Sequence, residues 1–129
     1  LTDIDLSSLR CLYNGSEPIR AKTIRRFVER FSSVGFEEKM IFSCYGLAEA
    51  TLAVTTSKLG ESPQIIKNLS SELVSCGGVY EDSKLKIINP ETKKECGESE
   101  VGEVWVGGKS ITSGYLNRPQ QTAETFVST

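Results

Sequence analysis

Two short polar segments have residue types that suit nucleotide or metal chemistry. The first is Asn14-Gly15-Ser16-Glu17-Pro18, and the second is Tyr45-Gly46-Leu47-Ala48-Glu49. Exposed backbone amides before a helix can bind a nucleotide, and a glycine such as Gly46 lets backbone approach a ligand closely. The Glu49 carboxylate suits Mg²⁺, which favours one or two carboxylates together with phosphate oxygens. Taken singly, each segment is equally compatible with a plain loop that carries no ligand.

The elements expected around these segments place both of them after strands. Residues Leu9–Tyr13 predict a strand, and Pro18 suits the first turn of a helix that ends near Gly35. Residues Met40–Cys44 predict the next strand, and strand–helix–strand at this spacing indicates a parallel β-α-β unit. Both segments then open on one edge of a sheet, where α/β proteins bind ligands. The helix has an apolar face at helical spacing, made of Ile24, Phe27, Val28 and Phe31.

The second half of the chain has a different pattern. Residues 52–56 could form a further strand, and residues 57–72 are polar and loop-like. Three short apolar runs follow, separated by turn residues, and Pro119 begins a predicted helix. The three runs are Leu73–Cys76, Lys84–Ile88 and Val101–Val106. The sequence therefore predicts an α/β part followed by a small antiparallel, β-barrel-like subdomain.

Composition excludes several classes of site. The chain has 129 residues, a net charge of −2 and no histidine, which removes Ser-His-Asp and Cys-His catalysis and Cys/His zinc sites. Its four cysteines lack close pairs, so a four-thiolate zinc site is disfavoured. Two Asn-x-Ser sequons, at Asn14 and Asn68, would suit a secreted, disulfide-bonded protein. No export signal is visible, so we expect buried free thiols in a reducing, cytoplasmic compartment.

The charge pattern and hydropathy argue against two kinds of partner. The predicted first helix has a basic face, which we interpret as solvated rather than as a phosphate-binding surface, since the whole chain is slightly acidic. We therefore expect no nucleic-acid partner. No apolar run approaches the roughly 20 residues of a membrane span. The basic face consists of Arg20, Lys22, Arg25, Arg26 and Arg30.

Four segments, in this order, resemble motifs of the acyl-adenylate-forming superfamily, which contains acyl-CoA synthetases, peptide-synthetase adenylation domains and luciferases. Asn14–Pro18 resembles its adenine-binding loop, and Tyr45–Thr51 resembles its Tyr-Gly-x-x-Glu motif. Val101–Gly108 is similar to its Gly-Glu-hydrophobic strand. Gly114–Pro119, with Thr122 and Phe126, is similar to its Gly-Tyr-x-x-Arg-Pro segment.

Within this superfamily, the sequence segments of this chain resemble most closely those of the fatty acyl-AMP ligases. They include Asp5–Arg10, the Asn-Gly-x-Glu-Pro loop, Tyr45–Leu52 and Val74–Gly77. One departure is that the link from Thr56 to Leu73 is short, whereas this branch usually has an inserted segment there. The departure leaves open whether the acyl group passes to an acyl-carrier protein or to CoA.

The resemblance implies a fatty acid substrate, ATP and Mg²⁺, and a role for each matching residue. Asn14, Gly15, Ser16, Glu17 and Pro18 would form the adenine-binding loop, with Ser16 to Pro18 lining the pocket largely through backbone. Tyr45 would lie near the adenine and the α-phosphate, with Gly46 and Leu47 beside the acyl-adenylate. Glu49 would hold the magnesium that bridges the ATP phosphates.

The resemblance also implies what these residues lack. The superfamily's glycine-rich phosphate loop is missing, and its ribose-binding Asp and catalytic lysine would fall beyond residue 129. We therefore expect an internal fragment, inactive alone, with residues 1–70 from the Rossmann-like α/β subdomain and 71–129 from the small β-barrel subdomain. Three alternatives stay open: an amino-acid adenylation domain, a non-catalytic adenylate-binding module, and an unrelated α+β domain.

Overall fold

The computed structural model describes residues 3–67, 71–80 and 82–127. By its contacts the chain forms two compact units, one of residues 1–46 and 53–80 and the other of residues 47–52 and 81–129. This division differs in position from the predicted subdomain boundary between residues 70 and 71, which stays a prediction about the parent enzyme. The second sequon, Asn68-Leu69-Ser70, lies outside the described residues.

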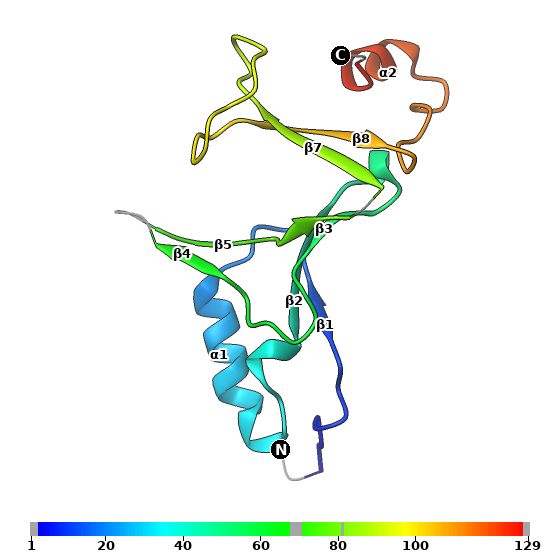
Figure 1. Ribbon diagram of the computed structural model, residues 1–129. Helices are drawn as coiled ribbons and strands as arrows, with labels where there is room; N and C mark the ends of the chain where they lie inside the picture. Colours follow the sequence, from blue (N-terminus) through cyan, green and yellow to red (C-terminus); the bar gives the residue numbers. More distant parts are fainter. Residues whose placement is uncertain (1–2, 68–70, 81, 128–129) are drawn as a thin grey trace. The chain divides into compact units, whose positions relative to one another are not determined.

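The first unit is built on a four-stranded sheet in the order β1-β2-β3-β6, of which β1, β2 and β3 are labelled in Figure 1. Strand β1 (Leu12–Asn14) runs parallel to β2 (Ile41–Gly46), and Leu12 pairs with Ile41. Helix α1 (Ala21–Phe31) connects the two, so the predicted parallel β-α-β unit is confirmed. Strand β3 (Ala53–Thr56) is antiparallel to β2, and β6 (Gly78–Val79), which the sequence did not predict, is antiparallel to β3.

Helix α1 begins later than Pro18 predicts. Arg20 is its extended N-cap, with φ −104° and ψ 123°, and makes no side-chain capping hydrogen bond. Ile19, just before it, packs against a core formed by Ile24, Phe36, Met40 and Ile41. The partly buried Ile19 and the extended Arg20 thus stand where the proline alone suggested a first turn, and the helix begins at Ala21. The helix continues into the 3₁₀ turn η1 (Ser32–Val34), which ends at Gly35 with φ 90°, and a second 3₁₀ turn, η2 (Glu38–Met40), precedes β2.

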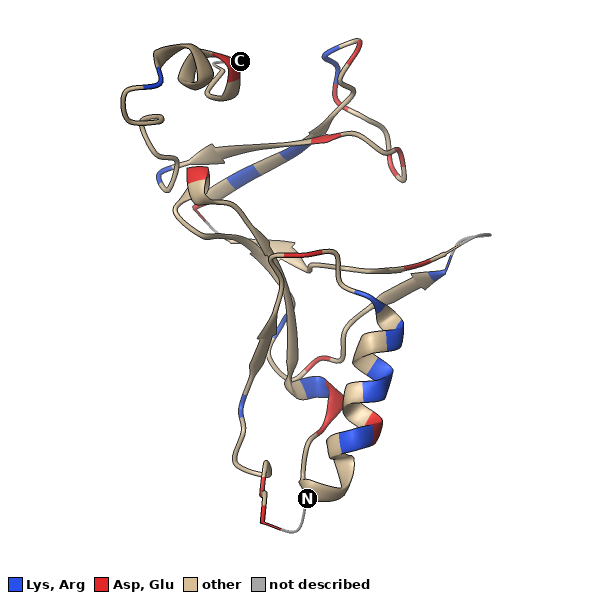
Figure 2. Cartoon of the chain, turned by 180° about the vertical axis from the view of Figure 1, so that it is seen from behind, with Lys and Arg blue, Asp and Glu red and all other residues tan. Residues whose placement is uncertain are grey.

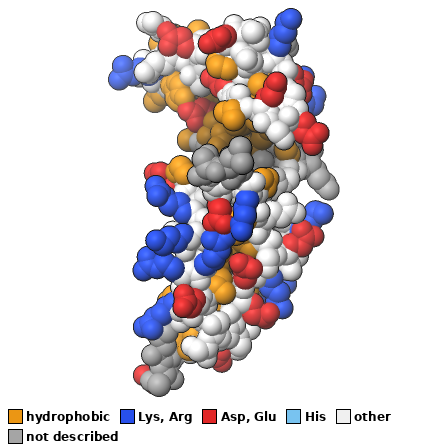
Figure 3. Space-filling view, turned by 90° about the vertical axis from the view of Figure 1, so that its left-hand side faces the viewer, with side chains coloured by type: hydrophobic (Ala, Val, Ile, Leu, Met, Phe, Trp, Pro, Cys, Tyr) orange, Lys and Arg blue, Asp and Glu red, His pale blue; other side chains and the backbone are white. Residues whose placement is uncertain are grey.

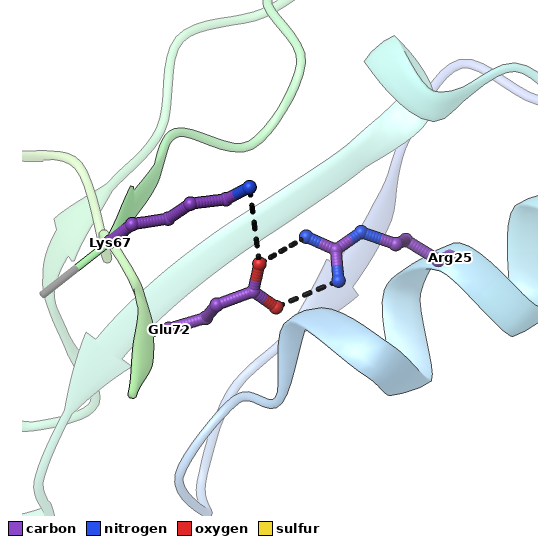
Figure 4. A network of polar contacts seen from close by, with 3 residues as sticks. All are labelled: Arg25, Lys67 and Glu72. Carbon is purple, nitrogen blue, oxygen red and sulfur yellow. Dashed lines mark hydrogen bonds and ion pairs between the residues drawn. The ribbon is translucent and has the colours of Figure 1, made fainter. Parts of the chain in front are cut away.

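The segment predicted as a polar loop, residues 57–72, contains a strand. Strand β4 (Ile65–Lys67) pairs with β5 (Glu72–Val74) in an antiparallel hairpin. The pairing partner of β4 supplies its regular structure, because three residues are too few to carry a periodic pattern. Glu72 in turn binds α1: Arg25 donates two hydrogen bonds to its carboxylate, at 2.7 and 2.8 Å, with Lys67 3.8 Å away (Figure 4).

The rest of the basic face of α1 is solvated. Lys22, Arg26 and Arg30 follow one another at intervals of four residues and are exposed, and among the described residues none of them forms an ion pair. Figure 2 shows Lys and Arg positions repeated along α1, and in Figure 3 Lys and Arg side chains gather on one face of the molecule. This agrees with the interpretation of a solvated helix face.

The second unit contains a two-stranded antiparallel sheet and two short helical elements. Strand β7 (Ser83–Ile88) pairs along its whole length with β8 (Glu103–Gly108), and Lys86 is opposite Trp105. The 3₁₀ turn η3 (Ala48–Ala50) belongs to this unit, as does α2 (Pro119–Thr125), which begins at the predicted proline. Within the described residues no sheet closes into a barrel, so the structure supports a mixed α/β fold with small sheets and leaves the barrel unconfirmed.

The four cysteines are free thiols, and each is half-buried rather than fully buried. No helix in the described part of the chain is long and apolar enough to cross a bilayer.

Candidate functional site

The predicted adenine-binding loop lies at the carboxyl end of β1. Asn14 is the last residue of that strand, and Ser16, in the bend that follows, has a left-handed φ of 69°. Left-handed backbone is uncommon for residues other than glycine and persists where the surroundings over-determine it. Ser16, Glu17 and Pro18 are exposed, whereas Asn14 and Gly15 are half-buried. The loop therefore presents its second half to solvent.

The loop contacts strand β2 closely. A Cβ added to Gly15 would lie 2.7 Å from both the carbonyl oxygen and the Sγ of Cys44, so only glycine allows this approach. The Cys44 thiol donates to the Asn14 carbonyl at 3.5 Å. Tyr45 follows Cys44 directly, and a register shift lies between Tyr45 and Gly46 in their pairing with β3. The structure therefore brings the loop and the first residues of the Tyr-Gly segment to one edge of the sheet, as the parallel pairing predicted.

Leu47 and Glu49 belong to the second unit. Leu47 is the extended N-cap of η3, and Glu49 is the middle residue of that turn. The backbone carbonyl of Glu49 accepts a hydrogen bond from the Thr112 amide at 2.8 Å. The Tyr115 hydroxyl donates a hydrogen bond to Oε1 of the Glu49 carboxylate.

The contact between Tyr115 and Glu49 shifts the pKa of both groups. The hydrogen bond from Tyr115 lowers the pKa of Glu49 from its usual value, and a backbone hydrogen bond of Glu49 itself adds to the effect. The same contact raises the pKa of Tyr115, because a neighbouring carboxylate disfavours the phenolate. The pair is therefore a neutral phenol and a charged carboxylate at neutral pH.

Glu49 lines a cavity of about 720 Å³ in the second unit. Its other walls come from β8, which contributes Trp105, and from the end of α2, which contributes Phe126. Leu47 also lines it, so two of the predicted site residues share this cavity.

The chemistry of the donor set fits a magnesium ion that ATP brings with it. Among the described residues there is no group of three or more His, Cys, Asp or Glu that could hold a metal alone. Mg²⁺ in nucleotide sites needs only one or two protein carboxylates, because phosphates and water complete its shell. The ionised Glu49, with one oxygen bonded to Tyr115, has the second oxygen for such a contact.

Sequence reasoning missed Tyr115 as the partner of Glu49. The two residues are 66 positions apart, and in isolation the segment around Tyr115 predicted only a loop that leads into a helix. Only the family motif, in which both segments recur, singled out this tyrosine. No spacing rule links side chains at such a distance in the chain.

Comparison with known proteins supports the sequence resemblance. A family model described as "AMP-binding enzyme" matches residues 2–116. The medium-chain-fatty-acid–[acyl-carrier-protein] ligase JamA of Moorena producens is 36% identical over 144 residues, which cover 96% of this chain and 24% of that protein. The chain spans about a quarter of the length of the curated relatives it matches.

Solved structures agree with the sequence match. A fatty acid AMP ligase from Legionella pneumophila superposes with a TM-score of 0.88 at 35% identity, over 95% of this chain and 24% of that one. A fatty acyl-adenylate ligase of L. pneumophila, solved in complex with acyl adenylate and pyrophosphate, gives a TM-score of 0.87 at 36% identity, over 93% and 24% of the two chains. The predicted resemblance is thereby confirmed, and the chain belongs to the AMP-binding enzyme family.

Proposed function

We propose that this chain is a segment of a fatty acyl-AMP ligase, which activates a fatty acid with ATP and passes the acyl group to an acyl-carrier protein. The observation that carries the proposal is the match to such ligases over nearly the whole chain, at 35–36% identity and with the same fold. Relatives named as fatty-acid–[acyl-carrier-protein] ligases favour a carrier protein over CoA as the acceptor.

The acceptor assignment has to account for the short link between Thr56 and Leu73. The match to JamA runs over 144 residues, more than the 129 of this chain, so that relative has additional residues within the matched segment. The identity to carrier-protein ligases persists despite this difference. We therefore propose that the shorter segment alters neither the activation step nor the carrier-protein acceptor.

The proposed reaction needs no general base from this chain. The carboxylate of a fatty acid is ionised near pH 7, and it attacks the α-phosphorus of ATP. A new bond forms between the carboxylate oxygen and phosphorus, the bond from the α-phosphorus to the bridging oxygen breaks, and pyrophosphate leaves. Catalysis of such a step depends mainly on positioning and on neutralising negative charge.

Each matching residue has a proposed task in that step. The loop Asn14–Pro18 would hold the adenine, and its exposed second half supports this. Tyr45, Gly46 and Leu47 would line the space of the adenylate. Glu49 would bind a Mg²⁺ that neutralises phosphate charge, and its place in the wall of the cavity of the second unit supports this role.

The test is ATP–pyrophosphate exchange in the parent ligase with a fatty acid as substrate. We expect Glu49→Ala to abolish exchange nearly completely while the melting temperature stays close to that of the unchanged enzyme. Glu98→Ala, an exposed glutamate of the same unit, is the control and should exchange normally. Near-normal exchange in Glu49→Ala would refute the metal role, and exchange by the 129-residue chain alone would refute its proposed inactivity.

A further inference from the structure

Three hydrogen bonds connect the turn of Glu49 to the segment of residues 110–115. The Tyr115 hydroxyl donates to the Glu49 carboxylate. The Thr112 amide donates to the Glu49 carbonyl at 2.8 Å, and the Thr51 hydroxyl donates to the Ser110 carbonyl at 2.7 Å. All of these residues lie in the second unit. Both the backbone and the side chain of Glu49 are therefore held by the same segment.

Tyr115 is itself held by α2. Its amide donates to the Thr122 hydroxyl at 2.9 Å, and that hydroxyl donates to the Arg118 carbonyl at 2.9 Å. The ring of Tyr115 meets that of Phe126 edge-on, with centroids 5.5 Å apart and planes at 74°. These contacts restrict both the backbone and the ring of the tyrosine, so its hydroxyl has a defined position.

The approach between this segment and α2 is close. A Cβ added to Gly114 would lie 2.4 Å from Cγ2 of Thr122. Gly114 also has a backbone φ of 136°, a value that residues other than glycine rarely adopt. A glycine directly before the tyrosine thus lets the backbone reach the helix. This close packing explains why a glycine directly precedes the tyrosine in the motif.

We propose that Tyr115 is the positioning residue of Glu49 and orients its carboxylate for the magnesium ion of ATP. This inference rests on the proposed function, since it assumes the metal role of Glu49. A hydrogen bond on Oε1 restricts rotation of the carboxylate, and Oε2 would then be the oxygen that binds the metal. Partners of this kind in the outer shell of a metal site fix the orientation of the ligand.

The chemistry of the donor suits this task. A phenol donates a hydrogen bond without bringing a positive charge, so the carboxylate keeps its net negative charge for a cation. A lysine or arginine in the same place would neutralise that charge and compete with the metal. Tyr115→Phe removes the hydroxyl and keeps the ring that meets Phe126, which separates the hydrogen bond from the packing.

The experiment measures Mg²⁺ dependence in the parent ligase. Loss of an outer-shell partner typically costs 10–100-fold in metal affinity or activity. For Tyr115→Phe we expect the Mg²⁺ concentration at half-maximal ATP–pyrophosphate exchange to rise by about 10–100-fold, with much of the rate restored at saturating Mg²⁺. Calorimetric titration of Mg²⁺ into the enzyme with a non-hydrolysable ATP analogue gives a second readout, in which the dissociation constant should rise by a similar factor.

Control variants separate positioning from a purely structural role. Tyr80→Phe changes a tyrosine of similar exposure, 42% against 37% for Tyr115, and should leave the Mg²⁺ dependence unchanged. In a Glu49→Gln background, Tyr115→Phe should add no further change in Mg²⁺ affinity, because the carboxylate that it orients is gone. The effects of two substitutions on the free energy of Mg²⁺ binding add when the residues act independently, and they fail to add when one residue acts through the other.

Two results would overturn the inference, and they differ from failure of the proposed function. If Tyr115→Phe lowers the melting temperature or the rate at every Mg²⁺ concentration without changing Mg²⁺ affinity, the tyrosine is only structural. If its effect on Mg²⁺ affinity persists undiminished beside Glu49→Gln, it does not act through Glu49. If Glu49→Gln itself leaves Mg²⁺ dependence unchanged, the proposed metal role fails, and the inference fails with it.

Discussion

Replacing Gly15 by alanine is expected to displace the predicted adenine-binding loop. The added Cβ would lie 2.7 Å from the Cys44 carbonyl oxygen, whereas ordinary van der Waals contact begins near 3.4 Å. The loop or strand β2 must therefore shift by about 0.7 Å, and the backbone carbonyl cannot rotate away as a side chain would. The φ of Gly15 lies outside the left-handed region, so the effect is steric rather than conformational.

Two energies of opposite sign decide the size of this effect. Overpacking costs about 1–3 kcal/mol, whereas Gly→Ala stabilises by about 0.4–1 kcal/mol through the unfolded chain where the backbone tolerates it. The steric cost is larger. If nucleotide binding must return the loop to its original place, a cost of about 1–3 kcal/mol raises the KM for ATP by about 5–150-fold, since about 1.4 kcal/mol corresponds to a factor of ten.

The assay is ATP–pyrophosphate exchange in the parent ligase at varied ATP, with thermal unfolding alongside. Gly78→Ala is the matched control, because a Cβ there meets nothing within 4 Å and its φ is not left-handed. Adding Cys44→Ala to Gly15→Ala should recover part of the loss, since it removes the Sγ contact and leaves the carbonyl contact. An unchanged KM for ATP in Gly15→Ala, with the fold intact, would refute the role of this loop in nucleotide binding.

Two further variants test the packing of the first unit. Ile24→Ala, at a core side chain 1% exposed, should destabilise the chain by about 2–5 kcal/mol in urea unfolding, whereas Ile66→Ala, 59% exposed, should change it by less than about 0.5 kcal/mol. Arg25 lowers the pKa of Glu72 below its usual value, so their pairing stabilises the fold above about pH 4.3, the usual glutamate pKa, and this stabilisation is lost as the pH falls through the lower pKa of the folded state. In Glu72→Gln the free energy of unfolding should therefore fall less steeply as the pH is lowered below about 4.3, whereas Glu98→Gln should behave like the unchanged chain. The same acid dependence in Glu72→Gln and in the unchanged chain would contradict this pairing.

In the first unit, the sequence predicts those helices and strands whose own residues carry a recognisable hydrophobic pattern. The apolar positions Ile24 and Phe27 recur at the helical period, so α1 could be recognised without any partner. Strand β2 begins with the apolar residues Ile41 and Phe42, and its first three residues, Ser43 included, are buried on both faces, as in strands inside an α/β sheet. Their parallel pairing followed from the length of the connection between strands.

The elements that escaped prediction depend on contacts made far along the chain. Strand β4 acquires its structure from β5 and from the ion pair of Glu72 with Arg25, which are 47 residues apart. Strand β6 has only two residues and exists through its pairing with β3. Contacts between distant residues also escaped prediction at the candidate site. A motif indicated Glu49, but only the tertiary structure shows that Tyr115 contacts it.

The pairing of Glu49 with Tyr115 also bears on how the proposed reaction depends on pH. The hydrogen bond lowers the pKa of the Glu49 carboxyl group from a usual value that already lies well below neutrality, so Glu49 is charged at neutral pH, where a fatty acid is also ionised. Because the same contact raises the pKa of Tyr115, the hydroxyl keeps its proton and continues to donate up to alkaline pH. Neither group changes charge near neutrality, so a fall in exchange between pH 6 and 8 would have to come from residues outside this pair. The chain itself contains no histidine, the side chain that ordinarily titrates there.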